Sequence, residues 1–294
     1  MSWYTGLEHI VREGEVLAAY SWLRIGGPAQ YFAEPTNKDE LAEIVRRCRQ
    51  HELPVRILGG GSNLLIADQG VRGTVIYLNA PAFGEISVQG TSLKAGGGAK
   101  LGHVVATAAR EGLSGLSAFV GIPGSVGGAL RGNCSGHGAA IGQWTEHVSM
   151  MTHEGTIRTR QRDDLRFGHG ESNLDELVIL EAVFRLEKQS PAEVTRQMQK
   201  LWILKRASQP TGENGCGRIF ADERGWIASE LIEQAGLKTA SEGGAWISEL
   251  NANYVEVRSG ATCQDVLRLI ERVRSSVSEN LGIELDCDLD VWLD

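Results

Sequence analysis

Two glycine-rich runs supply residue types that could bind phosphate groups. The first, Gly59-Gly60-Gly61-Ser62-Asn63, follows the predicted strand LPVRILG directly. Because glycines lack Cβ atoms, successive N–H groups can point at one anion, and the two polar side chains can add hydrogen bonds. The spacing matches neither GxGxxG nor GxxxxGK[ST], so the dinucleotide Rossmann motif and the P-loop are both disfavoured. Taken alone, this run is equally compatible with a tight turn.

The second run, GIPGSVGGA over residues 121–129, strengthens the interpretation. Its proline stiffens a turn, Gly124 and Ser125 can donate to a second phosphate or to a flavin ring edge, and the later glycines let a helix pack close to a ligand. Two separate anion sites fit a pyrophosphate cofactor better than a single phosphate, although a glycine-rich crossover is the alternative. The candidate cofactor-binding residues of this run are Gly121, Ile122, Pro123, Gly124, Ser125 and Gly128.

Composition limits the classes of partner. The formal net charge of −8, from 37 acidic and 29 basic residues, argues against broad nucleic-acid binding, which needs a basic surface. The five cysteines are scattered without a CxxC pair, so we expect no metal site and free thiols in a reducing compartment. Charges near the N-terminus and the lack of a long apolar run predict a cytoplasmic protein without membrane insertion.

Helices and strands alternate irregularly, which indicates an α+β fold. Amphipathic helices are expected over 38–50, 100–112, 191–206, 226–237 and 263–282, and strands near 53–59, 74–78, 146–160, 177–187, 253–257 and 283–293. A polar segment with a proline at 188–194 is a plausible boundary. We therefore predict three lobes over residues 1–78, 79–187 and 188–294.

A series of segments resembles, in order, the motifs of the UDP-N-acetylenolpyruvoylglucosamine reductases, the MurB family. They are SWLRIGGPAQYF (21–32), LGGGSNLLIADQGVRGTVI (58–76), GLSGLSAFVGIPGSVGGALRGNCSGHG (112–138), KRASQP (205–210), CGRIF (216–220) and ASELIEQAGLK (228–238). The resemblance implies the FAD-binding fold of vanillyl-alcohol oxidase relatives, in two lobes, with a compact third α+β lobe for a UDP-sugar. It further implies FAD as cofactor, NADPH as co-substrate, and reduction of UDP-N-acetylglucosamine enolpyruvate to UDP-N-acetylmuramate. We expect the protein to be a monomer.

The catalytic pattern implied by the resemblance is substituted at three positions. Gly170 stands where the family has an arginine, Arg218 where it has a proton-donating serine, and Asp288 where it has a glutamate. Reduction of an enolpyruvyl double bond needs a cation to stabilise the developing enolate and an acid to protonate it. Arg218 could replace the missing guanidinium, but it cannot donate a proton at neutral pH.

Several groups are open as the acid: Asp288, His137, His169, Cys216 with a depressed pKa beside Arg218, or a water molecule. Predicted substrate contacts are Arg206, which follows Lys205 before a Gln-Pro pair, and Asn133 in the glycine passage. Two other functions are compatible with the substitutions. One is a divergent or non-catalytic flavin-binding relative, and the other is a flavin oxidase acting on a different substrate.

Overall fold

The computed structural model describes residues 2–210, 216–222 and 225–293. Contacts divide these residues into two compact units. Unit 1 comprises the described residues of 1–14, 30–60 and 72–204, and unit 2 those of 15–29, 61–71 and 205–294. The division falls between Gly60 and Gly61, inside the first glycine run. The predicted three-lobe boundaries at 78 and 187 stay a prediction.

The N-terminal part of the chain forms a four-stranded sheet with strand order β1-β2-β5-β3. The helix α1 (Lys38–Gln50) begins at Asn37, whose side chain accepts hydrogen bonds from the N–H groups of Asp39 and Glu40. Its buried face is the predicted apolar stripe. The strands are β1 (Val11–Val16), β2 (Pro28–Ala33), β3 (Val55–Leu58) and β5 (Val71–Tyr77), and β3 and β5 run parallel.

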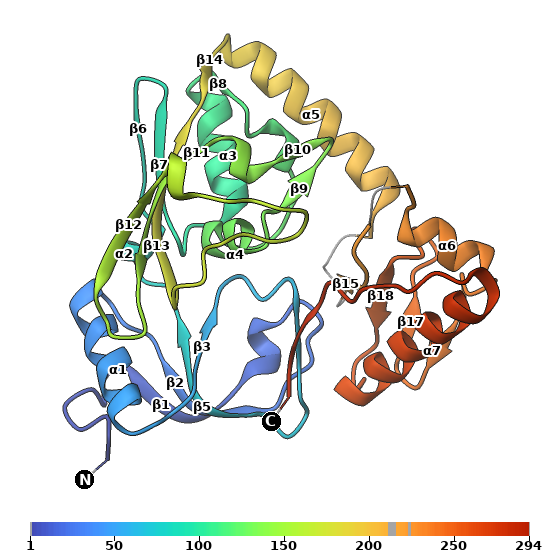
Figure 1. Ribbon diagram of the computed structural model, residues 1–294, viewed down its shortest axis with the longest axis horizontal. Helices are drawn as coiled ribbons and strands as arrows, with labels where there is room; N and C mark the ends of the chain where they lie inside the picture. The colour runs from blue at the N-terminus through green and yellow to red at the C-terminus, as the bar shows by residue number, and fades with distance from the viewer. Residues whose placement is uncertain (1, 211–215, 223–224, 294) are drawn as a thin grey trace. The chain divides into compact units, whose positions relative to one another are not determined.

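The rest of unit 1 is built on a five-stranded antiparallel sheet in the order β12-β11-β13-β7-β6. Helices α3 (Leu101–Arg110) and α4 (Val126–Arg131) lie against one face of this sheet, where apolar side chains of both layers form a buried core (Figure 1). The strands are β6 (Ile86–Gln89), β7 (Ser92–Gly96), β11 (Thr145–Met151), β12 (Ile157–Gln161) and β13 (Val178–Arg185).

Short elements complete unit 1. They are α2 (Pro81–Gly84), the pair β8 (Leu113–Ser114) and β14 (Glu187–Lys188), and the pair β9 (Ser135–Gly136) and β10 (Ala139–Ala140). The long helix α5 (Pro191–Ser208) follows, and Val194 is its buried residue. The 3-10 helices are η1 (Leu17–Tyr20), η2 (Ser117–Phe119), η3 (Ile141–Gln143) and η4 (Arg162–Asp164).

Unit 2 contains a four-stranded antiparallel sheet in the order β15-β18-β17-β16, with α6 (Ala228–Gln234) and α7 (Cys263–Leu281) on one side (Figure 1). Leu23, Ile25 and Leu65 from the N-terminal segments join the same core, which explains why those segments belong to unit 2. The strands are β15 (Cys216–Arg218), β16 (Ser241–Glu242), β17 (Ala245–Ile247) and β18 (Tyr254–Val257).

The closing strand is shorter than predicted. Of residues 283–293, only β19 (Asp290–Trp292) is a strand, and it pairs in parallel with β4 (Leu64–Ile66). Because β4 has only three residues, the partner strand has no further backbone to pair with. The alternation of apolar and polar residues in IELDCDLDVWL therefore overstated the length of the strand.

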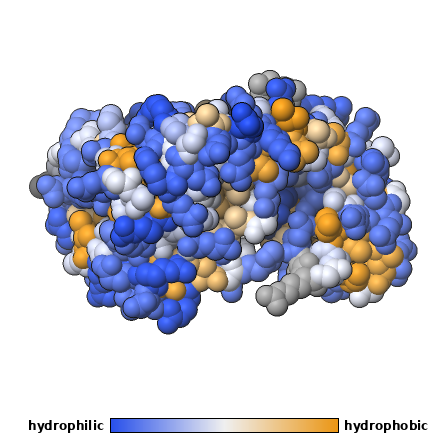
Figure 2. Space-filling view, turned by 90° about the horizontal axis from the view of Figure 1, so that it is seen from above, coloured by the Kyte–Doolittle hydropathy of each residue, from blue (hydrophilic) through white to orange (hydrophobic). Residues whose placement is uncertain are grey.

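The surface is predominantly hydrophilic on the face seen in Figure 2, and apolar residues gather there in small separate groups. Large exposed hydrophobic side chains include three consecutive residues of α5, Trp202, Ile203 and Leu204. Within the described ranges, the chain contains no helix that is both long and apolar enough to cross a bilayer.

The start of α7 is tied to the sheet of unit 2 by one carboxylate. Asp265 Oδ2 accepts hydrogen bonds from the N–H groups of Thr262, at 3.1 Å, and Gly244, at 3.1 Å. The Thr262 side chain accepts in return from the Asp265 N–H, which completes a capping box. The backbone hydrogen bonds from Thr262 and Gly244 lower the pKa of Asp265.

We expect Asp265→Asn to destabilise unit 2 at pH 7. The pKa of Asp265 is lower in the folded chain, so its contribution is full above the ordinary carboxyl pKa of about 3.9 and is lost as the pH falls through the lowered value. Thermal unfolding should show that the variant has a free energy of unfolding lower than the wild type by at least about 1 kcal/mol at pH 7. This difference should shrink toward pH 3. An equal deficit at both pH values would contradict this assignment.

Candidate functional site

The two glycine runs meet within unit 1, as their proposed shared ligand requires. A Cβ atom placed on Gly60 would lie 2.4 Å from the Cα atom of Gly124, and one on Gly59 would lie 2.6 Å from Ser125 Oγ. Real Cβ atoms do not approach a backbone that closely. The two loops are therefore in backbone-to-backbone contact, and only glycine at position 60 permits it.

These loops leave backbone donors without acceptors. Among the described residues, none accepts a hydrogen bond from the N–H groups of Gly60, Gly121, Gly124 or Ser125, whereas the Ile122 N–H donates to the Phe119 carbonyl. Ser125 is only 6% exposed, and its hydroxyl accepts from the Gly128 N–H. Gly60 is exposed and Gly121 and Gly124 are half-buried, so a ligand can reach these N–H groups. A cluster of unpaired backbone donors of this kind is suited to an anionic acceptor.

The remaining residues of the first run have a different role in unit 2. The Trp22 N–H donates to the Gly61 carbonyl at 3.0 Å, and the Asn63 amide donates to the backbone carbonyl of Asp288 at 2.6 Å. The Asn63 carbonyl accepts from the Asp290 N–H at 2.9 Å. Asn63 therefore fixes the backbone on both sides of Leu289 and sets the position of Asp288.

Two of the three substituted catalytic positions form an ion pair. Arg218 donates from Nε and Nη2 to Asp288 Oδ2, at 3.0 and 2.8 Å, and Arg218 Nη1 lies 3.6 Å from Asp222 Oδ2. Burial alone would lower the pKa of Arg218, but the charge and hydrogen bonds of Asp288 outweigh it and raise that pKa. The guanidinium is held charged between two carboxylates.

Backbone contacts hold the pair in register. The Asp288 N–H donates to the Ile219 carbonyl at 2.7 Å, directly after Arg218. Asn253 accepts from the Phe220 N–H at 2.9 Å and donates to the Phe220 carbonyl at 2.8 Å, which fixes β15 against β18. The site is therefore positioned by a main-chain hydrogen bond and by the buried side chain of Asn253.

Arg218 shares one face of the unit 2 sheet with Tyr254. The two residues are direct partners in the β15–β18 pairing, so their side chains project from the same face. Burial raises the pKa of Tyr254 to about 12. The opposite face carries buried apolar residues of β17 and β18 that pack against the helices: Ala245, Ile247, Val255 and Val257.

Cys216 does not have the electropositive environment that the sequence suggested. Burial raises the pKa of its thiol, and the charge of Glu256, its partner across the strands, raises it further. The interpretation of Cys216 as an acid with a depressed pKa was wrong, because burial and the charge of Glu256 both raise that pKa.

Asn133 and Gly170 belong to one loop system in unit 1. The Asn133 amide donates to the Gly168 carbonyl at 2.6 Å and its oxygen accepts from the Gly142 N–H at 3.1 Å. Gly170 has φ +70°, and a Cβ atom there would meet nothing within 4 Å. The open space would admit a side chain, but the left-handed backbone disfavours any residue except glycine.

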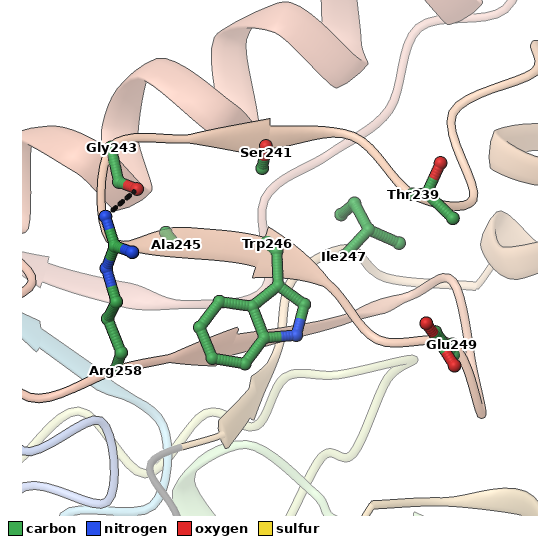
Figure 3. Close-up of a pocket in the computed structure, with 8 residues that line it drawn as sticks. All are labelled: Thr239, Ser241, Gly243, Ala245, Trp246, Ile247, Glu249 and Arg258. Carbon is green, nitrogen blue, oxygen red and sulfur yellow. Dashed lines mark hydrogen bonds between the residues drawn. The ribbon is translucent and has the colours of Figure 1, made fainter.

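Unit 2 also contains a pocket whose lining includes none of the predicted site residues. The pocket has a volume of ≈ 330 Å³ and is lined by Thr239, Ser241, Gly243, Ala245, Trp246, Ile247, Glu249 and Arg258. Figure 3 shows Trp246 extending from β17, while Arg258 donates to the Gly243 carbonyl. The predicted substrate contact Arg206 is exposed in the last turn of α5.

Comparisons with known proteins identify the class first. Residues 29–160 match the family described as FAD binding domain, and residues 209–292 match the C-terminal domain of UDP-N-acetylenolpyruvoylglucosamine reductase. Relatives with that reductase name include one from Rhodopirellula baltica, 39% identical over 97% of this chain and 94% of its own. Another, from Heliobacterium modesticaldum, is 38% identical over 94% of this chain and 89% of its own. The crystal structure of the MurB reductase from Thermus caldophilus has a TM-score of 0.83 and 32% identity, and the match covers 96% of this chain and 100% of that one.

The chain therefore belongs to the UDP-N-acetylenolpyruvoylglucosamine reductase family, and its fold is the α+β FAD-binding type that the sequence predicted. FAD fits the residues of unit 1. The free N–H groups of Gly60, Gly121, Gly124 and Ser125 are donors for its pyrophosphate, and the absence of Cβ atoms on three of them leaves room for close approach. The individual FAD contacts stay a prediction.

Sequence reasoning missed two residues of the site. Asp222 is the second carboxylate near Arg218, and its Oδ1 accepts from the Ala228 N–H at the start of α6. Tyr254 is the second, because it pairs directly with Arg218 across β15 and β18. Its signal was available in the alternation of NYVEV, where Tyr254 and Glu256 must face away from the buried Val255 and Val257.

We expect Gly60→Ala to lower both FAD content and stability. Its Cβ atom would lie 2.4 Å from the Gly124 Cα atom, so the loops must separate and the free N–H groups must diverge. The flavin-to-protein absorbance ratio should fall at least severalfold, and the melting temperature by several degrees. The matched control is Gly102→Ala in α3, where an added Cβ atom would meet nothing within 4 Å. This substitution should raise the free energy of unfolding by about 0.5–1 kcal/mol. Full FAD retention in Gly60→Ala would contradict the cradle.

Proposed function

We propose that this chain reduces UDP-N-acetylglucosamine enolpyruvate to UDP-N-acetylmuramate with electrons from NADPH. The proposal rests on the similarity to reductases of that name along almost the whole chain, including the C-terminal domain that holds Arg218 and Asp288. When bound, FAD supplies hydride transfer from NADPH to the enolpyruvyl double bond. Unit 1 would bind its pyrophosphate through the two glycine loops.

The Arg218–Asp288 pair gives the proposed site its cation. Reduction leaves negative charge on the carbon beside the substrate carboxylate, and a fixed guanidinium stabilises such charge. Arg218 is 36% exposed along its side chain, so one part of it is open to a ligand while Asp288 and Asp222 hold the rest. Arg218 thus takes the role of the guanidinium absent at Gly170, with Asp288 as its positioning partner.

The cellular context proposed follows from this reaction. UDP-N-acetylmuramate is a precursor of peptidoglycan, so the chain would serve cell-wall synthesis, and with it cell shape and division. We also propose a cytoplasmic location, which is supported by the use of NADPH and a nucleotide-sugar substrate. The acidic net charge of −8 supports a protein that does not bind nucleic acids, and we propose that it acts as a monomer.

The direct test is flavin absorbance. Purified protein should be yellow, NADPH should bleach it without oxygen, and the enolpyruvyl substrate should restore the oxidised spectrum. Bleaching without restoration would instead favour a flavin-binding relative that lacks this reduction, as the three substituted positions allow. A flavin that is reduced by an alcohol or a sugar, and whose oxidised spectrum is restored only by oxygen, would favour a flavin oxidase. A colourless protein that takes up no added FAD would contradict the FAD assignment itself.

Arg218→Ala should separate the two halves of the reaction. We expect flavin reoxidation by the substrate to slow about 100-fold, because a preorganised cation is lost, while reduction by NADPH changes less than about twofold. Stopped-flow absorbance measures both rates. The matched control is Arg272→Ala, which removes the exposed Arg272–Glu242 pair in the same unit and should leave both rates unchanged. Equal slowing of the two halves by Arg218→Ala would contradict the assigned role.

A further inference from the structure

The reaction proposed above needs a proton donor, and the ion pair does not provide one. A guanidinium does not release its proton at neutral pH, and Asp288 is the acceptor of two hydrogen bonds from Arg218. Within unit 2, a donor has to be a third group that faces the same region as Arg218. The unit 2 sheet limits the choice, because its open face carries few side chains.

Three groups with a transferable proton project from that face near Arg218: Cys216, Tyr254 and Glu256. Cys216 is 5% exposed, and burial raises the pKa of its thiol. Glu256 is paired with Cys216, one residue pair further from the guanidinium. Tyr254 is directly opposite Arg218, which makes it the nearest hydroxyl by register.

We propose that Tyr254 is a catalytic residue that donates the proton to the substrate, an inference that rests on the proposed function. Its hydroxyl has no hydrogen-bond partner in the part of the chain that the structure describes, although the side chain is half-buried. It is therefore free to face a ligand held by Arg218. No other role within unit 2 engages this hydroxyl in the described residues.

The chemistry of the phenol suits this step. With a pKa of about 12, Tyr254 keeps its proton throughout the neutral range, and it is still a far stronger acid than the carbon to be protonated. The positive charge of Arg218 favours the phenolate, opposing the effect of burial on the pKa. The same guanidinium thus stabilises the substrate carbanion before transfer and the phenolate after it.

The proposed step is balanced. Hydride addition to one carbon of the enolpyruvyl double bond moves the π electrons onto the carbon that carries the carboxylate. The Tyr254 O–H bond then breaks, the proton forms a new C–H bond at that carbon, and the electron pair stays on the phenolate oxygen. A solvent water molecule returns a proton to Tyr254. NADPH is the two-electron reductant throughout, as in the proposed function.

Tyr254→Phe tests the inference because it removes one oxygen and keeps the ring. We expect flavin reoxidation by the enolpyruvyl substrate to slow about 100-fold, as for loss of a general acid, while reduction by NADPH stays within about twofold. Calorimetric titration with UDP-N-acetylmuramate gives a readout independent of turnover, and its Kd should stay within about threefold. Tyr31→Phe in unit 1 is the matched control, since its ring packs edge-on against Trp3, and it should change none of these quantities.

Each result either supports or overturns the assignment of Tyr254 as the proton donor. Reoxidation within about threefold of the wild-type rate in Tyr254→Phe would overturn the assignment. So would a Kd weakened in proportion to the lost rate, because that would mark a residue that only binds. Unchanged flavin content and melting temperature are required of the variant, and Tyr254→Trp, which keeps a large ring without a hydroxyl, must show the same slow reoxidation. If the wild-type protein itself is not reoxidised by the substrate, the proposed function fails, and that failure is seen before any variant is made.

Discussion

The close approach of the Gly60 and Gly124 backbones is the constraint on which the cofactor-binding unit depends. Two loops, one following β3 and the other preceding α4, come so near that no Cβ atom fits between them. In this position neither loop can use the other's carbonyl groups, so several N–H groups stay without acceptors. These N–H groups lack protein acceptors in the free protein, and they gain hydrogen bonds when an anion binds. The glycines thus create the site because they have no Cβ atoms, which lets the two loops approach and leaves their N–H groups available to a ligand.

The site in unit 2 uses the opposite principle, because the groups around Arg218 are paired with one another. Asn63 holds the backbone of Asp288, Asp288 holds Arg218, and Asn253 fixes the backbone of Phe220, two residues after Arg218. A guanidinium positioned in this way keeps its direction without being buried completely. The Tyr254 hydroxyl, in contrast, has no hydrogen-bond partner among the described residues, although Tyr254 pairs directly with Arg218 across the strands. An unengaged donor next to a fixed cation is the observation on which the proposed proton transfer rests.

The sequence predicted these features unequally, and the reasons are physical. Helices α1 and α7 were found nearly to the residue because an apolar stripe and an N-terminal cap agree locally, and α7 also ends at a glycine. The glycine loops were noticed because two separate runs, rather than one, offer backbone donors to a pyrophosphate. The ion pair between Arg218 and Asp288, 70 residues apart, has no local signal, and the length of β19 depends on a partner strand more than 200 residues away. The Asn63–Asp288 contact was hidden for the same reason.

The substitutions at positions 218 and 288 are chemically matched rather than independent. Arginine at 218 introduces a charge into a partly buried strand, which would be costly without a carboxylate in reach. Asp288 meets that need at 2.8 Å, and Asp222 adds a second carboxylate at 3.6 Å. The shorter side chain of aspartate still reaches its partner here, because the long Arg218 side chain spans the distance to Asp288 that a serine at position 218 could not span. Simple loss of a catalytic site would leave charges unpaired or remove them. Instead, Arg218 and Asp288 form a complete ion pair, and the hydroxyl of Tyr254 beside them is unengaged. This arrangement is expected of a site in which the cation and the proton donor were replaced together.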